Sequence, residues 1–214
     1  MRMAKPLRRA ILDAALALVD SGGIDALSIR EVARRAKVTH QAPYHHFQDR
    51  AAILAAIAIE GFSLLREEMV AARDAAPAGA RVMACGVGYF RFAVAHRAHF
   101  RIMFRSESHS PRHAELRSAS IAALQILIEC VVAAQAARLA PSGDPTALVV
   151  TLWSAAHGLA SLWVDGAMSR AFVEAGRDAD VVGELVGRTL TDLLAAAAKQ
   201  RPRSVVGKRG SRAR

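Results

Sequence analysis

Apolar positions recur at the three- and four-residue spacing of helices along almost the whole chain, and no stretch alternates like a strand. The spacing predicts a first helix over residues 7–21, which ends at two consecutive glycines, Gly22 and Gly23. From residue 50 onward it predicts longer helices. Their approximate bounds are 50–74, 80–95, 96–104, 113–140, 145–168 and 179–199. The chain is therefore expected to have an all-α fold.

Between residues 22 and 50, the pattern predicts two short helices joined by a turn. Ser28 and Glu31 form a capping box that begins the first of them, and apolar side chains follow on one face. The second helix is expected over residues 40–47, with Thr39 as its N-cap candidate. Helices this short are not stable alone, so both are expected to pack on the preceding helix. Three small helices that end in a helix-turn-helix make a DNA-reading unit.

A set of residues at fixed spacing runs through these three helices and into the fourth. Its members are Ile11, Leu12, Ala14, Ala15, Leu18, Gly23, Ser28, Ile29, Val32, Ala33, Ala36, Val38, Thr39, Tyr44, His45, His46, Phe47, Asp49 and Arg50. This set resembles the N-terminal domain of TetR/AcrR-type regulators over residues 7–58. Two positions depart from the family's pattern. Lys37 stands where the family usually has glycine in a left-handed turn, and Pro43 removes one backbone donor from the recognition helix.

The resemblance implies that the second short helix enters the major groove of double-stranded DNA, with its N-terminal residues nearest the bases. His40 and Gln41 are the candidates for base contact, and Arg50, which replaces the family's usual lysine, is a candidate for phosphate contact. The full set of expected DNA-binding residues is Ser28, Arg30, Thr39, His40, Gln41, Ala42, Tyr44, His45 and Arg50. For each of them the plain alternative is solvated surface. No metal site is expected, because adjacent histidines on a helix point apart and no ligand cluster completes them.

The net charge of +10 is divided unevenly along the chain. Residues 1–50 hold nine Lys/Arg against five Asp/Glu, residues 200–214 hold six against none, and residues 51–199 hold fourteen of each. A basic head on a neutral body indicates an anionic partner at the head. The expected domains are a DNA-binding domain over residues 1–49 and an effector-binding and dimerisation domain over residues 50–199. Residues 200–214 are expected to be a disordered basic tail.

Residues 146–164 carry no formal charge, and this uncharged stretch is long enough to resemble a membrane span. Their scattered polar residues favour instead a helix buried by its own chain and by a partner chain, so no membrane association is expected. Trp153, His157 and Gly158 resemble the tryptophan–histidine–glycine (WHG) signature of one group of TetR-type C-terminal domains. His157 needs a polar partner, which is either a neighbouring helix or a ligand.

The C-terminal region is expected to hold an apolar effector pocket and a dimer interface. The candidate pocket residues are Met83, Tyr89, Phe90, Phe100, Met103, Phe104, Trp153 and His157, with most of them expected to be plain core. The candidate interface residues on the last helix are Val182, Leu185, Val186, Thr189 and Leu193. Residues 145–168 and 179–199 would form a four-helix bundle with their copies across a two-fold axis. The alternative is that the last helix only closes its own core.

The two cysteines, Cys85 and Cys130, lie in apolar helical stretches. Buried free thiols in a reducing cytosol are favoured over a disulfide or a sensor pair. Asp13 interrupts the N-terminal apolar run and no cleavage site follows it, so the protein is expected to be cytoplasmic.

Together these features predict a dimeric, ligand-responsive regulator that binds a palindromic operator as a repressor and is released by a small apolar effector. The alternative is an all-helical small-molecule-binding protein or enzyme with an incidental basic N-terminus. The chain shows no nucleophile–base pair, phosphate loop or metal spacing, so neither catalysis nor a cofactor is expected.

Overall fold

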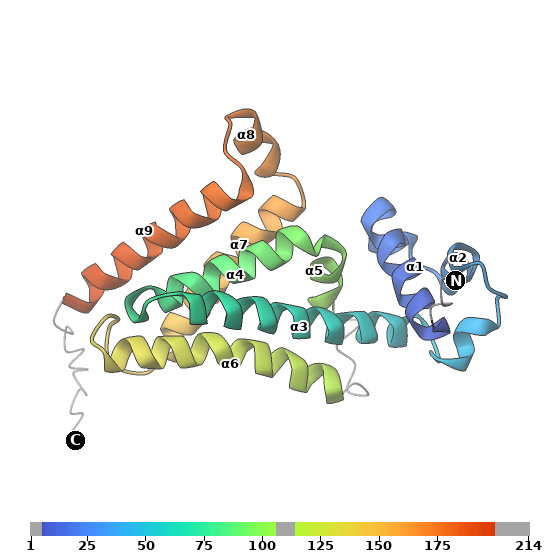
Figure 1. The fold of residues 1–214 in the computed structure, drawn as a ribbon, viewed down its shortest axis with the longest axis horizontal. Coiled ribbons are helices and arrows are strands. Elements are labelled where there is room, and N and C mark those ends of the chain that lie inside the picture. The colour runs from blue at the N-terminus through green and yellow to red at the C-terminus, as the bar shows by residue number, and fades with distance from the viewer. Residues whose placement is uncertain (1–5, 106–113, 200–214) are drawn as a thin grey trace, which may run out of the picture.

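The computed structural model describes residues 6–105 and 114–199, and within these ranges the chain is helical and has no strand. Figure 1 shows a small N-terminal unit at one end of a long helix, α3, and a larger group of helices around the rest of α3. We call residues 6–49 the head and residues 50–199 the body. The head contains α1 (Leu7–Gly22), η1 (Ile24–Ala26), α2 (Ile29–Ala36) and η2 (Ala42–His45). The body contains α3 (Arg50–Ala75), η3 (Ala78–Ala80), α4 (Arg81–Ala95), α5 (Arg97–Met103), α6 (Ala114–Ala136), α7 (Thr146–Val164), α8 (Ser169–Glu174) and α9 (Ala179–Lys199).

Local signals set the helix ends of the head. Helix α1 stops at Gly22, and Gly23 has a φ of 73°, a conformation that glycine adopts without a steric penalty. At the start of α2 the Ser28 hydroxyl accepts a hydrogen bond from the Glu31 backbone N–H at 3.2 Å. The Glu31 carboxylate does not complete the capping box but pairs with Arg34 at 2.8 Å. Lys37 ends α2 with φ 57° and ψ 43°, the left-handed geometry expected at this turn.

The predicted α-helix over residues 40–47 is wrong, because the chain forms only the 3₁₀-helix η2 over Ala42–His45. The Thr39 carbonyl would accept from the backbone N–H of residue 43 in an α-helix, but Pro43 has none. That carbonyl instead accepts from the Ala42 N–H at 3.0 Å, in the tighter 3₁₀ pattern. The Thr39 side chain does not cap η2, because the N-cap position falls on Gln41 and no side chain caps it.

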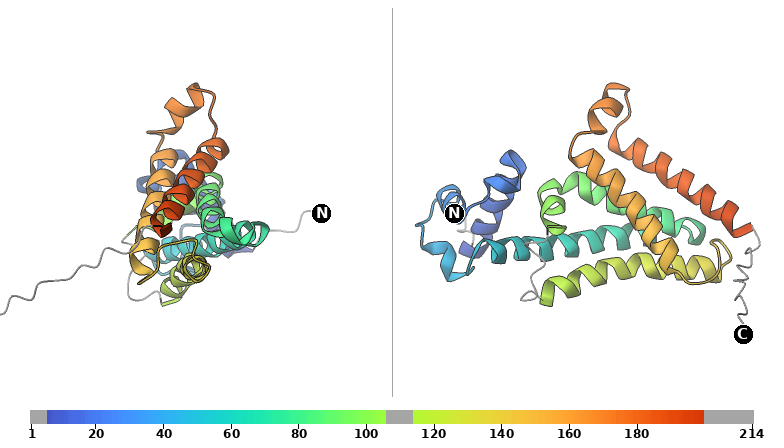
Figure 2. Two further views of the ribbon diagram at one scale, coloured as in Figure 1. Left: turned by 90° about the vertical axis from the view of Figure 1, so that its left-hand side faces the viewer. Right: turned by 180° about the vertical axis from the view of Figure 1, so that it is seen from behind.

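The body is layered on α3, whose first turn is capped by Asp49, which accepts from the Ala52 N–H at 2.8 Å. Helices α4, α5 and α6 pack on α3, and α7 and α9 pack on α4. The right-hand view of Figure 2, from behind, shows α7 crossing in front of α4 and α9 running along the upper side of the body. Two glycines bring α9 close to α4, because a Cβ at Gly183 would lie 2.8 Å from Phe90 and one at Gly187 would lie 2.7 Å from Met83.

Two of the predicted body helices end earlier than expected. The predicted helix over residues 113–140 ends at Ala136, and Arg138 has a positive φ of 60°. The predicted helix over residues 145–168 ends at Val164, and a turn separates it from the unpredicted α8. Asp144 accepts from the Thr146 N–H at 2.8 Å at the start of α7. The predicted disordered tail, residues 200–214, lies outside the described residues.

Helices α6 and α7 are long and apolar enough to cross a membrane, judged by length and composition alone. Helix α6 packs on α3 and α4, and α7 packs on α4 and α6. Core helices of a helical domain have the same composition, so these two helices do not indicate a membrane protein.

Candidate nucleic-acid interface and ligand cavity

The turn and η2 present most of the predicted DNA-reading side chains to solvent. Thr39, His40, Gln41, Tyr44 and His45 are exposed, whereas Ala42 is half-buried. The rings of His40 and Tyr44 lie 6.0 Å apart, so the two side chains share one surface. The structure therefore brings the sequence-predicted base-reading residues together on a short exposed segment.

This segment is anchored to the head from its inner side. Pro43 and Phe47 are buried, and the Arg8 guanidinium from α1 lies 5.6 Å from the centre of the Phe47 ring. The Phe47 N–H donates to the Pro43 carbonyl at 2.9 Å. These contacts fix the orientation of the exposed side chains, although η2 is too short to be stable alone.

The predicted phosphate-contacting residues fall into two groups. Ser28 and Arg30 are exposed at the start of α2, with the Ser28 hydroxyl engaged in capping. Arg50 is half-buried, and its guanidinium donates to the backbone carbonyls of Leu27 at 2.8 Å and of Ile24 at 2.9 Å. Arg50 therefore ties the start of α3 to η1, a structural role that its spacing in the sequence does not reveal.

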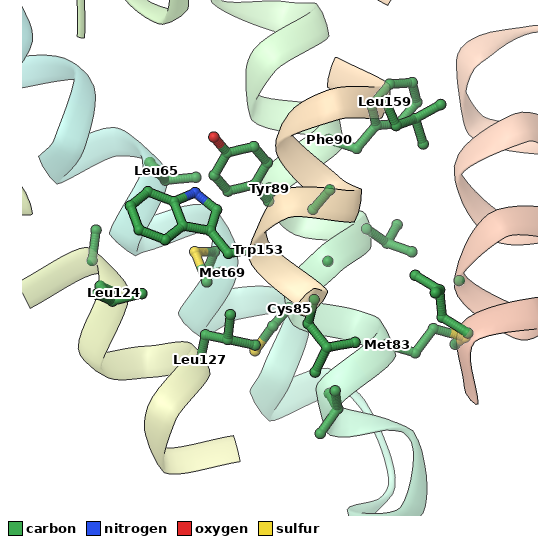
Figure 3. Close-up of a pocket in the computed structure, with 18 of the residues that line it drawn as sticks. Leu65, Met69, Met83, Cys85, Tyr89, Phe90, Leu124, Leu127, Trp153 and Leu159 are labelled. Carbon is green, nitrogen blue, oxygen red and sulfur yellow. The ribbon is translucent and has the colours of Figure 1, made fainter. Parts of the chain in front are cut away.

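An apolar cavity of about 220 Å³ lies inside the body, between α3, α4, α6, α7 and α9. Figure 3 shows Tyr89 and Phe90 of α4, Trp153 and Leu159 of α7, and Leu124 and Leu127 of α6 around it. Its wall is formed by Phe62, Leu65, Met69, Val82, Met83, Cys85, Gly86, Val87, Tyr89, Phe90, Phe104, Ser120, Ile121, Ala123, Leu124, Leu127, Leu152, Trp153, Ala156, Leu159, Gly183, Val186, Gly187, Leu190, Thr191 and Leu194. Almost every lining group is carbon, so the cavity suits an apolar ligand.

The sequence predicted only part of this wall. Met83, Tyr89, Phe90, Phe104 and Trp153 line the cavity. Phe100, Met103 and His157 do not, and Met103 is completely buried against the rest of the core. The lining leucines of α6, α7 and α9 were missed, because a leucine beside a cavity and one in a packed core have the same helical spacing.

His157 of α7 has a partner on a neighbouring helix. Its Nδ1 lies 2.8 Å from the Tyr89 hydroxyl of α4, and its ring lies 4.5 Å from that of Phe104. Burial lowers the pKa of His157 and raises the pKa of Tyr89. At neutral pH both groups are therefore uncharged, and the pair joins α7 to α4 without placing a charge near the cavity.

A polar cleft of about 330 Å³ lies where the head meets the body. We call it the junction cleft. Residues 23–25 of the head form one side of it. Body residues form the rest, namely Phe100, Arg101, Phe104, Arg105, His157, Ser161 and Asp165. Phe104 lines both the cleft and the apolar cavity, so the two spaces share this side chain.

An ion network holds the head on the body beside this cleft. Arg9 of α1 pairs with Glu60 of α3 at 2.7 Å and with Asp13 at 2.6 Å. The second carboxylate oxygen of Glu60 lies 3.3 Å from Nε2 of His99, a buried residue of α5. Burial lowers the pKa of His99, while the nearby Glu60 carboxylate acts in the opposite direction. Helices α1, α3 and α5 are thus joined at one point.

The predicted dimer stripe on α9 mixes two faces of that helix. Val182 is 4% exposed and packs in its own core, and Val186 lines the cavity, so neither belongs on an outer interface. Leu185, Thr189 and Leu193 do face solvent, with Leu193 61% exposed. Besides Val182, the buried residues of α9 are the glycines Gly183 and Gly187, which helical spacing of large apolar residues does not reveal.

Other apolar side chains of α9 and α7 are also exposed. Val181 on α9 and Val150 and Leu162 on α7 are each more than two-fifths exposed. Helix α7 carries no charged residue that would interrupt the surface. In the described ranges, no group of three or more His, Cys, Asp or Glu side chains is placed to hold a metal ion.

Two family models match the chain, and together they cover both regions. Residues 11–57 match the model of bacterial regulatory proteins of the tetR family, and residues 82–193 match that of the tetracyclin repressor-like C-terminal domain. Neither match identifies the WHG group that Trp153, His157 and Gly158 resemble. No curated protein matches the chain.

Solved structures share the fold over most of the chain. A Rhodococcus sp. RHA1 protein of unknown function is 32% identical, with 90% of this chain and 97% of that one covered and a TM-score of 0.75. A tetR-family regulatory protein from Rhodococcus RHA1 is 19% identical, with 91% and 98% covered and a TM-score of 0.71. AibR, solved in complex with isovaleryl coenzyme A and operator DNA, is 22% identical, with 88% and 98% covered and a TM-score of 0.65.

Proposed function

The chain belongs to the TetR family of bacterial transcriptional regulators, and on that basis we propose that it is a dimeric repressor released from its operator by a small apolar effector. One observation carries this proposal. Helix α3 begins at the head, where Arg50 is tied to η1, and its later residues Phe62, Leu65 and Met69 line the apolar cavity. A ligand in the cavity therefore touches the same helix that carries the head.

The head would contact DNA through the exposed segment Thr39 to His45, with His40 and Gln41 at the bases. Ser28, Arg30 and Arg50 would lie nearest the phosphates. The two heads of a dimer would read half-sites roughly 34–36 Å apart, or a multiple of that distance. An effector that favours a different head spacing would weaken operator binding by a coupling of about 1–3 kcal/mol.

The interface that supports dimer formation is the exposed apolar face of α7 and α9. Leu185, Thr189 and Leu193 stay in this proposal, and Val181, Val150 and Leu162 are added to it. Helix α7 carries no charged residue, and an exposed apolar surface is typical of a protein–protein interface and costly to leave in water. Helix α7 from each chain would pair with α9 to give a four-helix bundle across a two-fold axis.

The effector is proposed to be a mostly apolar compound, because the cavity wall offers few polar groups. The AibR structure holds an acyl thioester, isovaleryl coenzyme A. A short branched or linear acyl chain would also suit a cavity of about 220 Å³ here. The proposed site of action is the cytoplasm, where operator DNA is found.

Selection from a random duplex pool at two salt concentrations tests the DNA-binding half of the proposal. We expect a palindromic sequence to be enriched, with binding that weakens as salt rises because phosphate contacts release counterions. Enrichment of no sequence, or binding without salt dependence, would contradict it. The selected operator then serves as the probe for the effector.

A cavity-filling variant tests the ligand-binding half. A Cβ added at Gly86 meets no atom within 4 Å, so Gly86→Leu should fill part of the cavity without a clash. Apolar compounds that raise the Tm of the wild type and release the operator should lose both effects in this variant. Gly158→Ala on α7 is the matched control, since its Cβ also meets nothing within 4 Å and Gly158 does not line the cavity. Equal responses of both variants would exclude the cavity as the effector site.

A further inference from the structure

Two thiols lie in contact beneath the cavity wall. The Sγ atoms of Cys85 on α4 and Cys130 on α6 are 3.1 Å apart, and both residues are free cysteines. Their side chains are buried, with exposures of 0% and 4%. The two residues are 45 positions apart in the chain, so the contact is formed by packing and not by local sequence.

The pair can be reached from only one of the described spaces. Cys85 lines the apolar cavity, together with Met69 and Leu127, whereas Cys130 contacts Cys85 without being part of the lining. Carbon and sulfur dominate this wall, so charged or strongly polar reagents are disfavoured from entering. A reagent that reaches the pair through the cavity therefore has to be small or apolar.

The contact also prepares the sulfurs for reaction. One thiol hydrogen lies between the two sulfurs, and the hydrogen bond from Cys85 lowers the pKa of Cys130, helped by the positive charge of Arg73. The same contact and, after it, burial raise the pKa of Cys85. Cys130 is therefore the thiol of the pair that loses its proton first, and its thiolate lies 3.1 Å from the Cys85 sulfur, where it can accept the Cys85 proton.

We propose that Cys85 and Cys130 form an oxidation site at which an organic hydroperoxide, admitted through the apolar cavity, creates a disulfide between α4 and α6. The Cys130 thiolate takes the Cys85 proton as the Cys85 sulfur attacks the outer peroxide oxygen. An S–O bond forms, the O–O bond breaks, and the alkoxide leaves as the alcohol after taking the proton that Cys130 had first lost. The Cys130 sulfur then attacks the Cys85 sulfur, and the hydroxyl group leaves as water. In total, two thiols and one hydroperoxide become one disulfide, one alcohol and one water.

The disulfide changes the shape of the body. An S–S bond is about 2.05 Å long, so the two sulfurs have to move closer than in the present contact. Helices α4 and α6 both pack on α3 and both line the cavity, so the bond fixes two of its walls to each other. An effect of this bond on operator binding rests on the proposed function, whereas formation of the bond does not.

Mass spectrometry of the full chain treated with cumene hydroperoxide or hydrogen peroxide tests the site. We expect loss of the two thiol hydrogens, a peptide that links Cys85 to Cys130, and full recovery with dithiothreitol. Cys85→Ser and Cys130→Ser should each abolish the linked peptide. Gly86→Leu should slow the reaction with cumene hydroperoxide at least several-fold more than that with hydrogen peroxide, because it narrows the entry route.

Different results separate the parts of the inference. The oxidation site is overturned if both thiols stay reduced while the chain remains folded. It is also overturned if disulfides form only between separate chains. An equal slowing of both peroxides by Gly86→Leu would overturn the entry route. A disulfide that forms without altering operator affinity would refute only a regulatory effect, and a chain that binds no operator at all would contradict the proposed function while leaving the oxidation site in place.

Discussion

The head is closed inside and polar outside, whereas the body keeps a cavity inside and apolar side chains on its surface. In the head, Ile11, Leu12, Val32 and Phe47 form a small core, and the exposed residues of the turn and η2 are held by backbone hydrogen bonds. In the body, empty space of about 220 Å³ lies beneath α7 and α9, whose outer faces expose valine and leucine. The head is thus a closed core with a polar surface, whereas the body has both internal space and an uncovered apolar surface.

This difference indicates how the two regions should respond to change. A surface fixed by the backbone is altered only where a residue is replaced, so head substitutions should act locally. A region with a cavity and an uncovered apolar face can be altered by what fills or covers it. The regions are joined through α3, through the Arg50 contacts to η1, and through the Arg9–Glu60–His99 network.

The largest effects are expected where a charge is placed on α9. Leu193→Asp puts a charge on the exposed face, so we expect a folded, soluble monomer with steeply reduced operator affinity, because one head makes half of the contacts. Val182→Asp puts the charge in the core of its own chain and should destabilise folding by about 3–5 kcal/mol. Sedimentation and thermal unfolding of the two variants measure these outcomes.

The variants Leu193→Asp and Val182→Asp together also test whether α9 has one buried face and one outer face. If Leu193→Asp unfolds the chain like Val182→Asp, the outer face of α9 is part of the monomer core. If Leu193→Asp remains a dimer, α9 is not in the interface, and the exposed apolar side chains of α6, such as Ile121, become the next surface to test.

Substitutions of Arg50 test the contacts that connect the head to the body. Arg50→Ala removes its hydrogen bonds to the Ile24 and Leu27 carbonyls and should destabilise the head by about 1.5–3 kcal/mol, since bonds from a charged donor are the stronger ones. Operator binding should weaken for all sequences. Arg50→Lys keeps the charge but not the planar fork, so it separates the structural role from phosphate attraction.

The two outcomes for Arg50 are distinguishable by salt dependence. If Arg50 acts only through phosphate, Arg50→Lys restores affinity, and Arg50→Ala reduces the salt slope by about one unit without lowering the Tm. If it acts through η1, both variants lower the Tm, and the slope changes little. The structure favours the second result, with any phosphate contact added to it.

The base-reading residues should show smaller and more local effects. Gln41→Ala and His40→Ala should leave the fold and the salt slope nearly unchanged and should relax base preference by about 1–3 kcal/mol at the contacted positions. Operator selection with each variant measures this change. Selection of the same operator with equal stringency by both variants would remove η2 as the reading element. His46→Ala, outside the predicted set but exposed on the same segment, is the matched control.

The sequence predicted the helices better than the spaces between them. Ser28, Gly23 and Asp49 act on their nearest neighbours along the chain, so their capping and turn roles were readable before the structure. Pro43 was recognised as a missing donor, but its consequence, a 3₁₀-helix in place of an α-helix, depends on which carbonyl finds another partner. The spacing of the three short helices indicated a DNA-reading unit, and the family resemblance indicated which of its residues face the bases and the phosphates.

The cavity and the outer face of α9 were less predictable for a physical reason. Helical spacing shows that a residue is apolar and on a given face, but not whether the facing helix reaches it. Gly183 and Gly187 bring α9 against α4, which turns Val182 inward and leaves Leu193 outside. The Cys85–Cys130 contact and the Arg50 contacts likewise join segments far apart in the chain, so no local pattern marks them.

The smallest expected effect concerns how stability depends on pH through the Arg9–Glu60–His99 network between head and body. Burial holds the pKa of His99 below the ordinary histidine value of 6.5, so the unfolded chain binds a proton there before the folded chain does. Stability should therefore fall as pH drops below about 6.5 and should stop falling on this account below the folded pKa. His99→Asn removes the group and should flatten that part of the curve, as measured by urea unfolding between about pH 7 and pH 5.

His157→Asn provides a comparison within the body, because burial lowers the pKa of His157 in the same direction. The two residues lie on different helices and each has its own polar partner, Glu60 for His99 and Tyr89 for His157. The effects of the two substitutions on the slope of stability against pH should therefore add in the double variant. Only His99 touches the network that joins α1 to α3, so His99→Asn alone should also make operator affinity less sensitive to pH. If the slope of stability against pH stays unchanged in His99→Asn, the Glu60 carboxylate offsets the effect of burial on the His99 pKa.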